Sequence, residues 1–447
     1  MSILNKLKEN QIKLPIGVGQ LISYIPYGIR PYTGNIYKLR KKEISVFEYS
    51  SDEEKKNFIF SHVYNIVKYA ISNISFYKEY YYDCNFRIED LKCFSDITKI
   101  PIINKKVLLK YSLDKRSNAE MAKYIVNTGG SSGHTLSFYV QPSSIGHEWA
   151  HMHTIWEKLG FVQSDLKLCF SGRGHLQEGI EYDFARHTLL LDMYRPINSY
   201  GDKLKIILKK HPCKYLHGYP SALYELALYC RDSDNELRKI LCHSLKGAFL
   251  GSEYPYSLFR KTIEETFDIP TISWYGHTER CVLAYEKKAP FCYYPFQTYG
   301  FTEAISRGDG TYGLVGTSYY NYASPLIRYD TEDSINSPQY VNDILESFEI
   351  EDGRKGQFVI DKNGSKISLT GLIFGRHHKL FNHCSHIQIA QRSKGEATIL
   401  YVQNKNENII PEALFDSENI NINFHFEKLE GPIKTPSGKI NLLVEKF

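Results

Sequence analysis

Six short segments of this 447-residue chain carry side chains that could take part in chemistry. The first, residues 128–133 (TGGSSG), holds three glycines and three hydroxyl side chains. Such a loop can direct backbone N–H groups and hydroxyls toward an anion. It lacks the lysine and the helix that follow a P-loop, and Gly-Ser runs mostly mark loops. The spacing alone therefore favours a surface turn over an anion-binding loop.

A second segment matches the zinc-peptidase pattern H-E-x-x-H. His147 and His151 would lie one helical turn apart as ligands, with Glu148 as the base. The chain has 16 histidines, so a chance match is easily formed. On a helix, both histidines lie opposite Trp149 and Met152, which predicts that they face solvent. We therefore expect no zinc site here.

The third segment, residues 377–386 (HHKLFNHCSH), combines four histidines with Cys384. It could bind a transition metal, but it has no recognisable ligand spacing, which favours a polar hinge or strand. The fourth, residues 274–279 (WYGHTE), places Glu279 after a β-prone run, where a carboxylate could meet a metal-bound phosphate. The fifth and sixth are residues 325–333 (PLIRYDTED) and 434–439 (KTPSGK). Each of these segments alone is weak evidence for a functional site, because single carboxylates and lysines are usually solvated.

Alternating strand, turn and helix patterns position these segments. β-prone runs at 123–127 and 136–140 flank the first, and helices are predicted from Glu53 and from Ser144. Strand–turn–helix patterns at 216–227 and 247–267, followed by a strand at 271–275, indicate an α/β core. We expect residues 1–50 to be irregular and residues 295–375 to be turn-rich with short strands. The last stretch mixes strands with a helix, and a domain boundary is predicted at residues 375–376.

Composition excludes several classes of protein. Hydrophobic residues make up 42% and charged residues 23%, as in ordinary globular proteins, and the net charge of +5 argues against nucleic acid as the main partner. The nine cysteines form no C-x-x-C pair, and their odd number leaves at least one unpaired, which suits a reducing compartment. The N-terminus has no apolar signal core, and no stretch is suited to span a bilayer. We therefore expect a soluble, cytoplasmic protein without a transmembrane segment.

The order of the six segments resembles the adenylate-forming superfamily of acyl-CoA synthetases. Within it, the chain is most similar to the phenylacetate–CoA ligase branch and its CapK-like capsule-biosynthesis members. The similarity runs from about residue 76 to the C-terminus and is carried by residues 99–106 (KIPIINKK), 218–221 (GYPS), 275–279 (YGHTE) and 437–439 (SGK). It implies an α/β fold with a large domain of mixed sheets and helices, residues 1–375. A small, mobile α+β domain, residues 376–447, would follow.

The resemblance also implies roles for single residues. Thr278 would contact the α-phosphate of ATP, Glu279 would hold Mg²⁺, and Lys439 would be the mobile catalytic lysine. Asp333 would bind the ribose hydroxyls, with Arg376 close by. The phosphate loop would consist of Thr128, Gly129, Gly130, Ser131, Ser132 and Gly133. The residues bordering the adenine would be Gly251, Ser252, Glu253, Tyr275 and Gly276. The substrate pocket would include Gly218, Tyr219, Trp274 and His277, although Trp274 could equally pack in the core.

Three segments depart from the pattern of the family. The phosphate loop usually ends Gly-Lys, and here His134 follows the last glycine. The ribose motif usually reads RYRTGD, and here it reads RYDTED; the expected hinge aspartate is His378. These changes are expected to alter the affinity for pyrophosphate and the motion of the hinge. Because Glu279, Asp333 and Lys439 are retained, we expect an active enzyme.

The resemblance thus implies an ATP-dependent ligase that activates a small carboxylic or amino acid as an acyl-AMP. The acyl group would pass to CoA or to an amine, such as that of an amino-sugar. A role in the synthesis of a surface polysaccharide, either capsule or O-antigen, is expected from the CapK-like members. The alternatives are an aryl-CoA ligase of catabolism, a non-catalytic AMP- or acyl-binding homologue, and the zinc peptidase.

Overall fold

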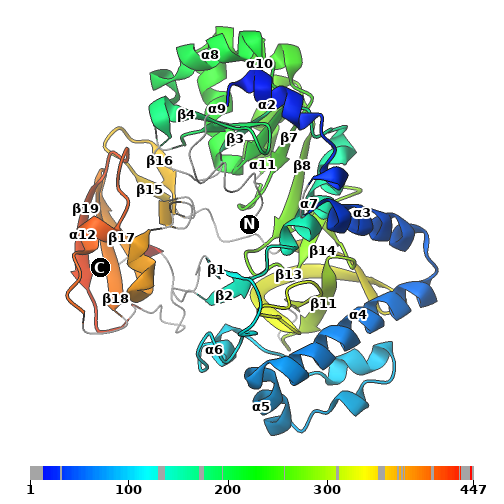
Figure 1. The fold of residues 1–447 in the computed structure, drawn as a ribbon. Coiled ribbons are helices and arrows are strands. Elements are labelled where there is room, and N and C mark those ends of the chain that lie inside the picture. The colour runs from blue at the N-terminus through cyan, green and yellow to red at the C-terminus, as the bar shows by residue number, and fades with distance from the viewer. Residues whose placement is uncertain are drawn as a thin grey trace.

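A computed structural model describes most of the chain. The described residues are 14–30, 33–128, 136–170, 176–193, 195–255, 257–308, 312–350, 358–369, 372–373, 376, 378–403, 407–431, 433 and 443–444. A central mixed sheet dominates the fold, with helices on both faces of its parallel half (Figure 1). The predicted α/β class with mixed sheets is therefore confirmed.

The central sheet has a parallel half and an antiparallel half. Its strands β5, β3, β6, β7 and β8 are parallel neighbours, and β9 begins the antiparallel half beside β8. In spatial order the strands are β11 (Gly300–Ser306), β12 (Tyr312–Ser318), β13 (Tyr329–Val341), β14 (Ile344–Ile350), β10 (Cys292–Pro295), β9 (Leu283–Glu286), β8 (Thr271–Gly276), β7 (Gly247–Leu250), β6 (Tyr215–Gly218), β3 (Lys167–Phe170), β5 (Thr188–Leu191) and β4 (Ile180–Asp183). Several strands of residues 300–350 are longer than the short ones expected there, and β13 reaches 13 residues.

The parallel strands are buried on both faces, as is usual when helices cover a parallel sheet. On one face, Leu216 and Leu250 pack with a helical layer. On the other, Tyr215 and Phe249 pack beneath α7 (Ser144–Trp156). The helices of the first layer are α8 (Gly201–Lys210), α9 (Pro220–Asp232), α10 (Asn235–Ser244) and α11 (Ser257–Phe267). The predicted helices at 144 and 257 and the strands that flank them are confirmed.

The expectation that residues 1–50 are irregular is wrong. They include α2 (Ile16–Ser23) and the 16-residue helix α3 (Gly34–Tyr49). α3 has no continuous apolar stripe, because one of its few buried side chains is Arg40, which lies 4.2 Å from the ring centre of Tyr320. The helix is instead held by close packing on α7. A Cβ added at Gly146 would lie 2.9 Å from Ile36 of α3.

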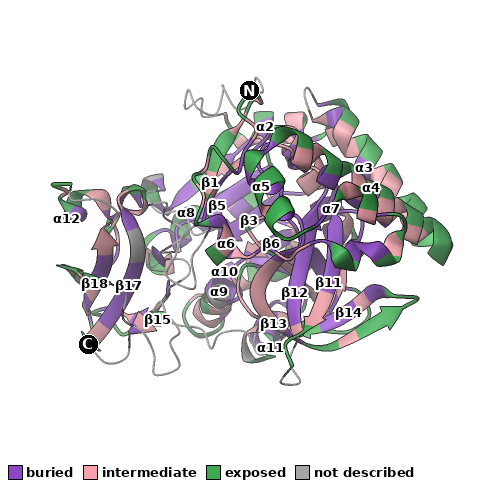
Figure 2. Ribbon diagram, turned by 90° about the horizontal axis from the view of Figure 1, so that it is seen from below, coloured by how far each residue is buried: buried purple, intermediate pink, exposed green. Residues whose placement is uncertain are grey.

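The antiparallel half of the sheet packs against the predicted helix α4 (Asp52–Asn73). Ser51 and Glu54 form a capping box that fixes the start of α4. The neighbouring helices are α5 (Ser75–Asp83) and the short α6 (Lys105–Leu108). Figure 2 shows the buried strands behind this layer, whose outer face is exposed. Within the described part of the chain, no helix is long and apolar enough to cross a membrane.

The C-terminal part forms a smaller unit at one side of the molecule (Figure 1). Its sheet has the order β19 (Asn423–Lys428), β18 (Glu396–Gln403), β17 (Cys384–Ser393) and β20 (Leu443–Val444), and α12 (Pro411–Leu414) lies beside it. The hydrophobic core of this unit also contains Val359 and Leu369, which lie in and just after the hairpin of β15 (Phe358–Ile360) and β16 (Lys366–Ser368). A smaller C-terminal unit is thus present, and its boundary at residues 375–376 stays a prediction.

Candidate active site

Three of the predicted segments meet at one edge of the sheet. The parallel neighbours β6, β7 and β8 end at Gly218, Leu250 and Gly276. The N–H of Gly251 donates to the carbonyl oxygen of Gly218 at 3.2 Å, which joins the first two strand ends. Open α/β sheets bind ligands outside the carboxyl ends of their strands. This edge is therefore the candidate active site.

Two glycines allow the chain to approach its neighbours closely at this edge. Gly218 has a φ of +148°, and a Cβ there would lie 2.4 Å from the carbonyl oxygen of Phe170. A Cβ at Gly251 would lie 2.2 Å from the indole of Trp274. Trp274 is half-buried and packs against the core beneath α7, 5.5 Å from the ring of His217. Core packing thus accounts for part of its surface, and its place in a substrate pocket stays a prediction.

The loops that follow the strands carry the other predicted residues of this edge. Ser252 is exposed and has a left-handed backbone with a φ of +68°, and Glu253 beside it is half-buried. Tyr219 precedes Pro220 at the first turn of α9, and burial raises the pKa of its phenol. Thr278 and Gly276 are exposed at the end of β8. All of them lie at the strand ends or on the loops that leave this edge.

The structure brings Tyr275 and Asp333 together although they are 58 residues apart. The Tyr275 hydroxyl donates to Oδ2 of Asp333 at 2.7 Å. Burial, and then the negative charge of Asp333, raise the pKa of the phenol well above its ordinary value, so it remains a donor at neutral pH. The predicted adenine-border and ribose-binding residues therefore form one contact.

Glu279 lies in the turn after β8 and contacts two other side chains. His277 Nδ1 donates to Oε2 of Glu279 at 3.0 Å, and the Tyr329 hydroxyl donates to Oε1 at 3.2 Å. Burial would raise the pKa of Glu279, but the hydrogen bond and charge of His277 outweigh it and hold the pKa below its ordinary value. The pKa of His277 is raised despite burial, by Cys281 and by Glu279. Glu279 is thus an anion at neutral pH, as a Mg²⁺ ligand must be.

Sequence reasoning missed two cations beside this site, Lys105 and Arg280. Lys105, a buried lysine at the start of α6, acts through its charge to lower the pKa of Glu279. Arg280, the next residue along the chain, has a left-handed backbone and donates to Ser144 Oγ at 3.3 Å. Its Nε also lies 4.0 Å from Glu148 of α7. The only signal in the sequence was the position of Lys105 in the family-like segment 99–106.

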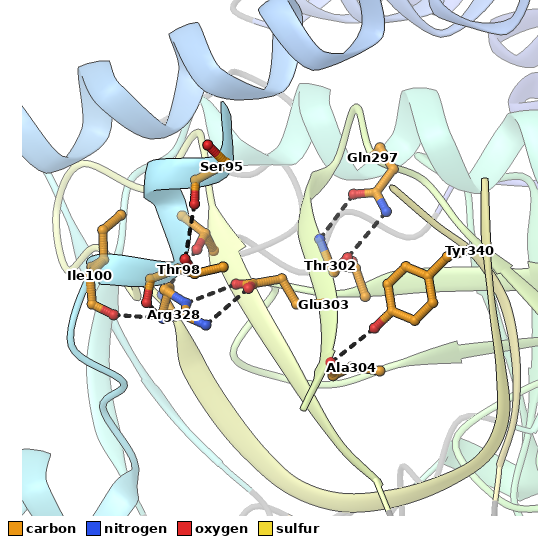
Figure 3. Close-up of polar contacts among 10 residues, drawn as sticks. Ser95, Thr98, Ile100, Gln297, Thr302, Glu303, Ala304, Arg328 and Tyr340 are labelled. Carbon is orange, nitrogen blue, oxygen red and sulfur yellow. Dashed lines mark hydrogen bonds and ion pairs between the residues drawn. The ribbon is translucent and has the colours of Figure 1, made fainter. Parts of the chain in front are cut away.

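A buried arginine anchors the segment that leads to Asp333. Arg328 and Glu303 form a two-pronged ion pair, with Nε–Oε2 and Nη2–Oε1 distances of 3.0 Å (Figure 3). Nη1 of Arg328 also donates to the carbonyl oxygens of Thr98 and Ile100, both at 2.7 Å. The backbone of Arg328 accepts from the N–H of Ile103 at 3.1 Å. These bonds hold the start of β13, and with it the RYDTED segment, against residues 98–103.

We expect Glu303→Gln to destabilise the protein, because it leaves the buried Arg328 guanidinium without its counter-charge. Removing one partner of a buried pair costs about 3 kcal/mol or more. Urea unfolding followed by tryptophan fluorescence should show a clearly lower midpoint. The matched control is Glu265→Gln on α11, which breaks an exposed pair with Lys261 and should change stability by less than about 0.5 kcal/mol. Equal midpoints for the two variants would contradict the anchoring role.

The described end of the phosphate-loop segment lies in a hairpin. β1 (Tyr124–Asn127) and β2 (Ser137–Val140) pair antiparallel, as the β-prone runs predicted. Thr128 closes the ladder, because its N–H donates to the Leu136 carbonyl and its Oγ1 accepts from the Leu136 N–H, both at 2.9 Å. Thr128 therefore has a structural role at this turn. Five residues of the predicted loop lie outside the described residues: Gly129, Gly130, Ser131, Ser132 and Gly133.

In the C-terminal part, Arg376 is buried, and its guanidinium donates to the carbonyl oxygens of Asp416 at 3.0 Å and Glu418 at 2.6 Å. These bonds hold the Arg376 side chain within the C-terminal unit. The predicted place of Arg376 beside Asp333 therefore rests on the resemblance alone. His378 accepts from the Asp416 N–H at Nδ1 and binds the Leu372 carbonyl through Nε2, both at 2.8 Å. At the expected hinge position it is therefore a packed, neutral histidine. Lys439 lies outside the described residues.

The prediction that His147 and His151 face solvent is wrong. His151 is fully buried, with Nδ1 bound to the His147 carbonyl oxygen at 2.8 Å and Nε2 to Thr298 Oγ1 at 3.0 Å. His147 stacks on Tyr320, with ring centres 4.0 Å apart. The reason is that α3 and the 319–320 segment cover the face of α7 that the helical pattern left open. Both ring nitrogens of His151 are engaged, which leaves none for zinc.

In the His/Cys segment near residue 380, the described side chains also make structural contacts. His378 stacks on Phe415 at 3.9 Å, His383 pairs with Glu407 at 3.0 Å, and Cys384 is buried in the C-terminal core. Across the described residues, no group of three or more His, Cys, Asp or Glu side chains is arranged to hold a metal ion. The interpretation as a polar hinge or strand agrees with these contacts, since β17 begins at Cys384.

Similarity to known proteins extends over nearly the whole chain. Protein CapK of Staphylococcus aureus is 24% identical over 410 residues, which cover 86% of this chain and 87% of CapK. 2-Hydroxyisobutyryl-CoA ligase, in complex with 2-HIB-AMP and CoA in the thioesterification state, superposes with a TM-score of 0.58 at 15% identity. That match covers 90% of this chain and 91% of the ligase. The same enzyme in its postadenylation state with R3-HIB-AMP gives a TM-score of 0.56 at 14% identity, covering 90% and 92% of the two chains.

No protein-family profile matches the sequence. The resemblance predicted from the order of the motifs is nevertheless confirmed by the relative and by the solved structures, whose matches cover 86% and 90% of this chain. The chain therefore has the fold of the adenylate-forming acyl-CoA ligases.

Proposed function

We propose that this protein is an ATP-dependent ligase that activates a carboxylic acid as an acyl-AMP and then transfers the acyl group. The observation that carries the proposal is the carboxyl edge of the sheet. There Gly251, the Tyr275–Asp333 contact and the anionic Glu279 come together on a fold whose solved relative binds an acyl-AMP and CoA. Fold similarity at this level of identity does not by itself define an activity. The residues at the edge supply the chemical argument.

The reaction has two steps. In the first, an oxygen of the substrate carboxylate attacks the α-phosphorus of ATP, the bond to the β-phosphate oxygen breaks, and pyrophosphate leaves. In the second, a thiol or amine attacks the acyl carbon, the bond to the phosphate oxygen breaks, and AMP leaves. The first step brings together anions, so it needs donors and cations placed where charge develops. Thr278 at the exposed strand end would donate to the α-phosphate, and Asp333 would hold the ribose.

Glu279 fits the role of a Mg²⁺ ligand. Mg²⁺ is commonly bound by one or two protein carboxylates together with substrate phosphates, rather than by a cage of protein groups. Glu279 is anionic, and each carboxylate oxygen that accepts from His277 or Tyr329 has a second lone pair. Bound there, the ion would neutralise phosphate charge.

The C-terminal unit would supply Lys439. Its own hydrophobic core, which gathers residues from Val359 to Ile422, allows the unit to move as a body. Such movement would bring Lys439 to the carboxylate and α-phosphate oxygens for the first step and withdraw it for the second. His378, which is packed between Leu372 and Asp416, would tie the hinge to this core. Residues 376–447 are the mobile unit of this proposal, and the preceding residues that share its core, Val359 to Ile373, would move with it.

The acceptor and the biological role come from the two relatives. The solved ligase binds CoA, which makes CoA the first acceptor to test. The CapK relative supports a role in the synthesis of a surface polysaccharide, in which an amino-sugar could take the acyl group instead. Both acceptors react with the same acyl-AMP, so the first half of the reaction can be tested without knowing the second.

The test is a panel of carboxylic and amino acids, assayed for pyrophosphate release with Mg-ATP. We expect at least one acid to give acid-dependent release and an enzyme-bound acyl-AMP, detectable by mass spectrometry. Adding CoA or amino-sugars should then discharge the acyl-AMP and release AMP. If no acid supports release while AMP still binds, the chain is a non-catalytic nucleotide-binding homologue.

A further inference from the structure

A cavity of about 350 Å³ lies between α7 and the parallel sheet. Its floor is formed by side chains of β3, β5 and β6, and its walls by aromatic rings, among them Trp149, Trp156 and Phe161. Tyr27 and Arg30 of the N-terminal segment complete the lining. The Tyr27 N–H donates to Gln163 at 2.9 Å, so this segment is held in place. The volume is in the range of small-molecule sites.

Strand geometry shows in which direction the cavity extends. Lys167 and Cys169 lie on the same face of β3, since side chains alternate along a strand, and Cys169 pairs with His217 of β6. His217 directly precedes Gly218, so this end of the cavity adjoins the candidate active site. Its ring is 5.5 Å from Trp274, which covers Gly251. Lys167 lies two residues, or about 6.5 Å, further from the carboxyl edge.

The far end of the cavity is positively charged. The lining residues include three cations, Lys167, Arg30 and Arg186, but one carboxylate, Asp183, which pairs with Arg186 at 2.9 Å. Lys167 is buried, and in the described structure it donates to the carbonyl oxygen of Arg186 and forms no ion pair. Burial lowers the pKa of Lys167 to about 8, so the amine is still mostly protonated at neutral pH.

Arg30, like Lys167, is a buried cation that donates to backbone carbonyl oxygens. It donates to the carbonyl oxygens of Ile25 and Ala185, and its guanidinium lies 4.0 Å from the ring centre of Tyr27. Burial lowers the pKa of Arg30. Burying cations without a counter-charge is costly. An anion that entered this end of the cavity would remove that cost for both side chains.

We propose that this cavity binds the acid substrate and that the substrate is bifunctional: a carboxylic acid whose far end carries a second anionic group. This inference rests on the function proposed above. The reacting carboxylate would lie at the strand ends near His217, and the second group would be bound by Lys167 and Arg30. Aromatic walls favour an apolar or aromatic middle. The second group takes no part in the reaction; it positions the substrate and selects it.

The test compares matched acids that differ by one anionic group: 4-carboxyphenylacetate against phenylacetate, and adipate against hexanoate. In acid-dependent pyrophosphate release, we expect the kcat/KM of the diacid to exceed that of its partner at least about tenfold, because a site built for a polar group rejects analogues that lack it. Lys167→Met should abolish this preference, and Lys167→Arg, which keeps the charge, should retain it. Lys209→Met is the control, since Lys209 forms an exposed pair with Glu236 and lies outside the lining.

Binding without ATP separates this inference from the proposed function. Isothermal calorimetry with the diacids should show binding that Lys167→Met or, if that variant does not fold, Arg30→Gln weakens about tenfold. Diacid binding without pyrophosphate release from any acid would support the pocket and overturn the ligase. Release that favours the monoacids, or a diacid preference that survives both substitutions, would overturn the bifunctional substrate and leave the ligase standing.

Discussion

Replacing Lys439 by alanine should reduce formation of the acyl-AMP by about two to three orders of magnitude, the usual cost of losing a group that stabilises developing charge. Lysine suits this role because its long stem delivers a compact charge to phosphate and carboxylate oxygens. ATP affinity should change little, because Asp333 and Tyr275 lie on the large unit. Pyrophosphate release, measured with an acid identified from the panel, tests the first step.

The Lys439→Ala substitution should impair the first step of the reaction but not the second. Supplied with preformed acyl-AMP, the Lys439→Ala variant should still transfer the acyl group to its acceptor, because Lys439 would be withdrawn at that stage. The matched control is Lys434→Ala, five residues earlier in the same KTPSGK segment, which should keep normal adenylation. Near-normal adenylation by Lys439→Ala would make this lysine an ordinary solvated residue near the chain end.

Glu279→Gln should lower adenylation about 100-fold and remove its dependence on Mg²⁺, because a neutral amide is a poor ligand for this ion. The fold should survive, since the glutamine oxygen can still accept from the Tyr329 hydroxyl. His277 would lose a negative partner, so its pKa should fall. The measurements are pyrophosphate release over a Mg²⁺ titration and an NMR titration of His277.

A control for Glu279 is available on the same sheet. Glu346→Gln on β14 removes an exposed carboxylate whose pair with Lys288 spans 3.6 Å, and it should leave activity and Mg²⁺ dependence unchanged. Unchanged pyrophosphate release by Glu279→Gln at saturating Mg²⁺ would remove Glu279 from the site. A parallel loss of activity and unfolding midpoint would instead give Glu279 a structural role, and this would equally contradict the assignment.

Local patterns in the sequence predicted the α/β core well. The helix at α4, the strand–turn–helix units around β6 and β7, and the hairpin of β1 and β2 all appear where alternation, capping and glycine placement indicated. These features depend on neighbours within a few residues, so periodicity and turn residues suffice. The α3 helix was missed because its buried face includes Arg40 and is completed by Gly146 and Tyr320, which are distant in the sequence.

For the candidate site, too, some features followed from the sequence and others only from the tertiary structure. By itself the sequence determined the kind of enzyme, since the order of the YGHTE, RYDTED and SGK segments indicated an adenylate-forming ligase, and it predicted the site residues. Only the tertiary structure decided which groups meet: Tyr275 with Asp333, and Glu279 with His277 and Tyr329. It also turned His147 and His151 inward and buried Lys167 in a cavity without a carboxylate partner among the described residues. The reason is physical: burial and charge pairing depend on contacts between segments far apart in the chain, which no local spacing encodes.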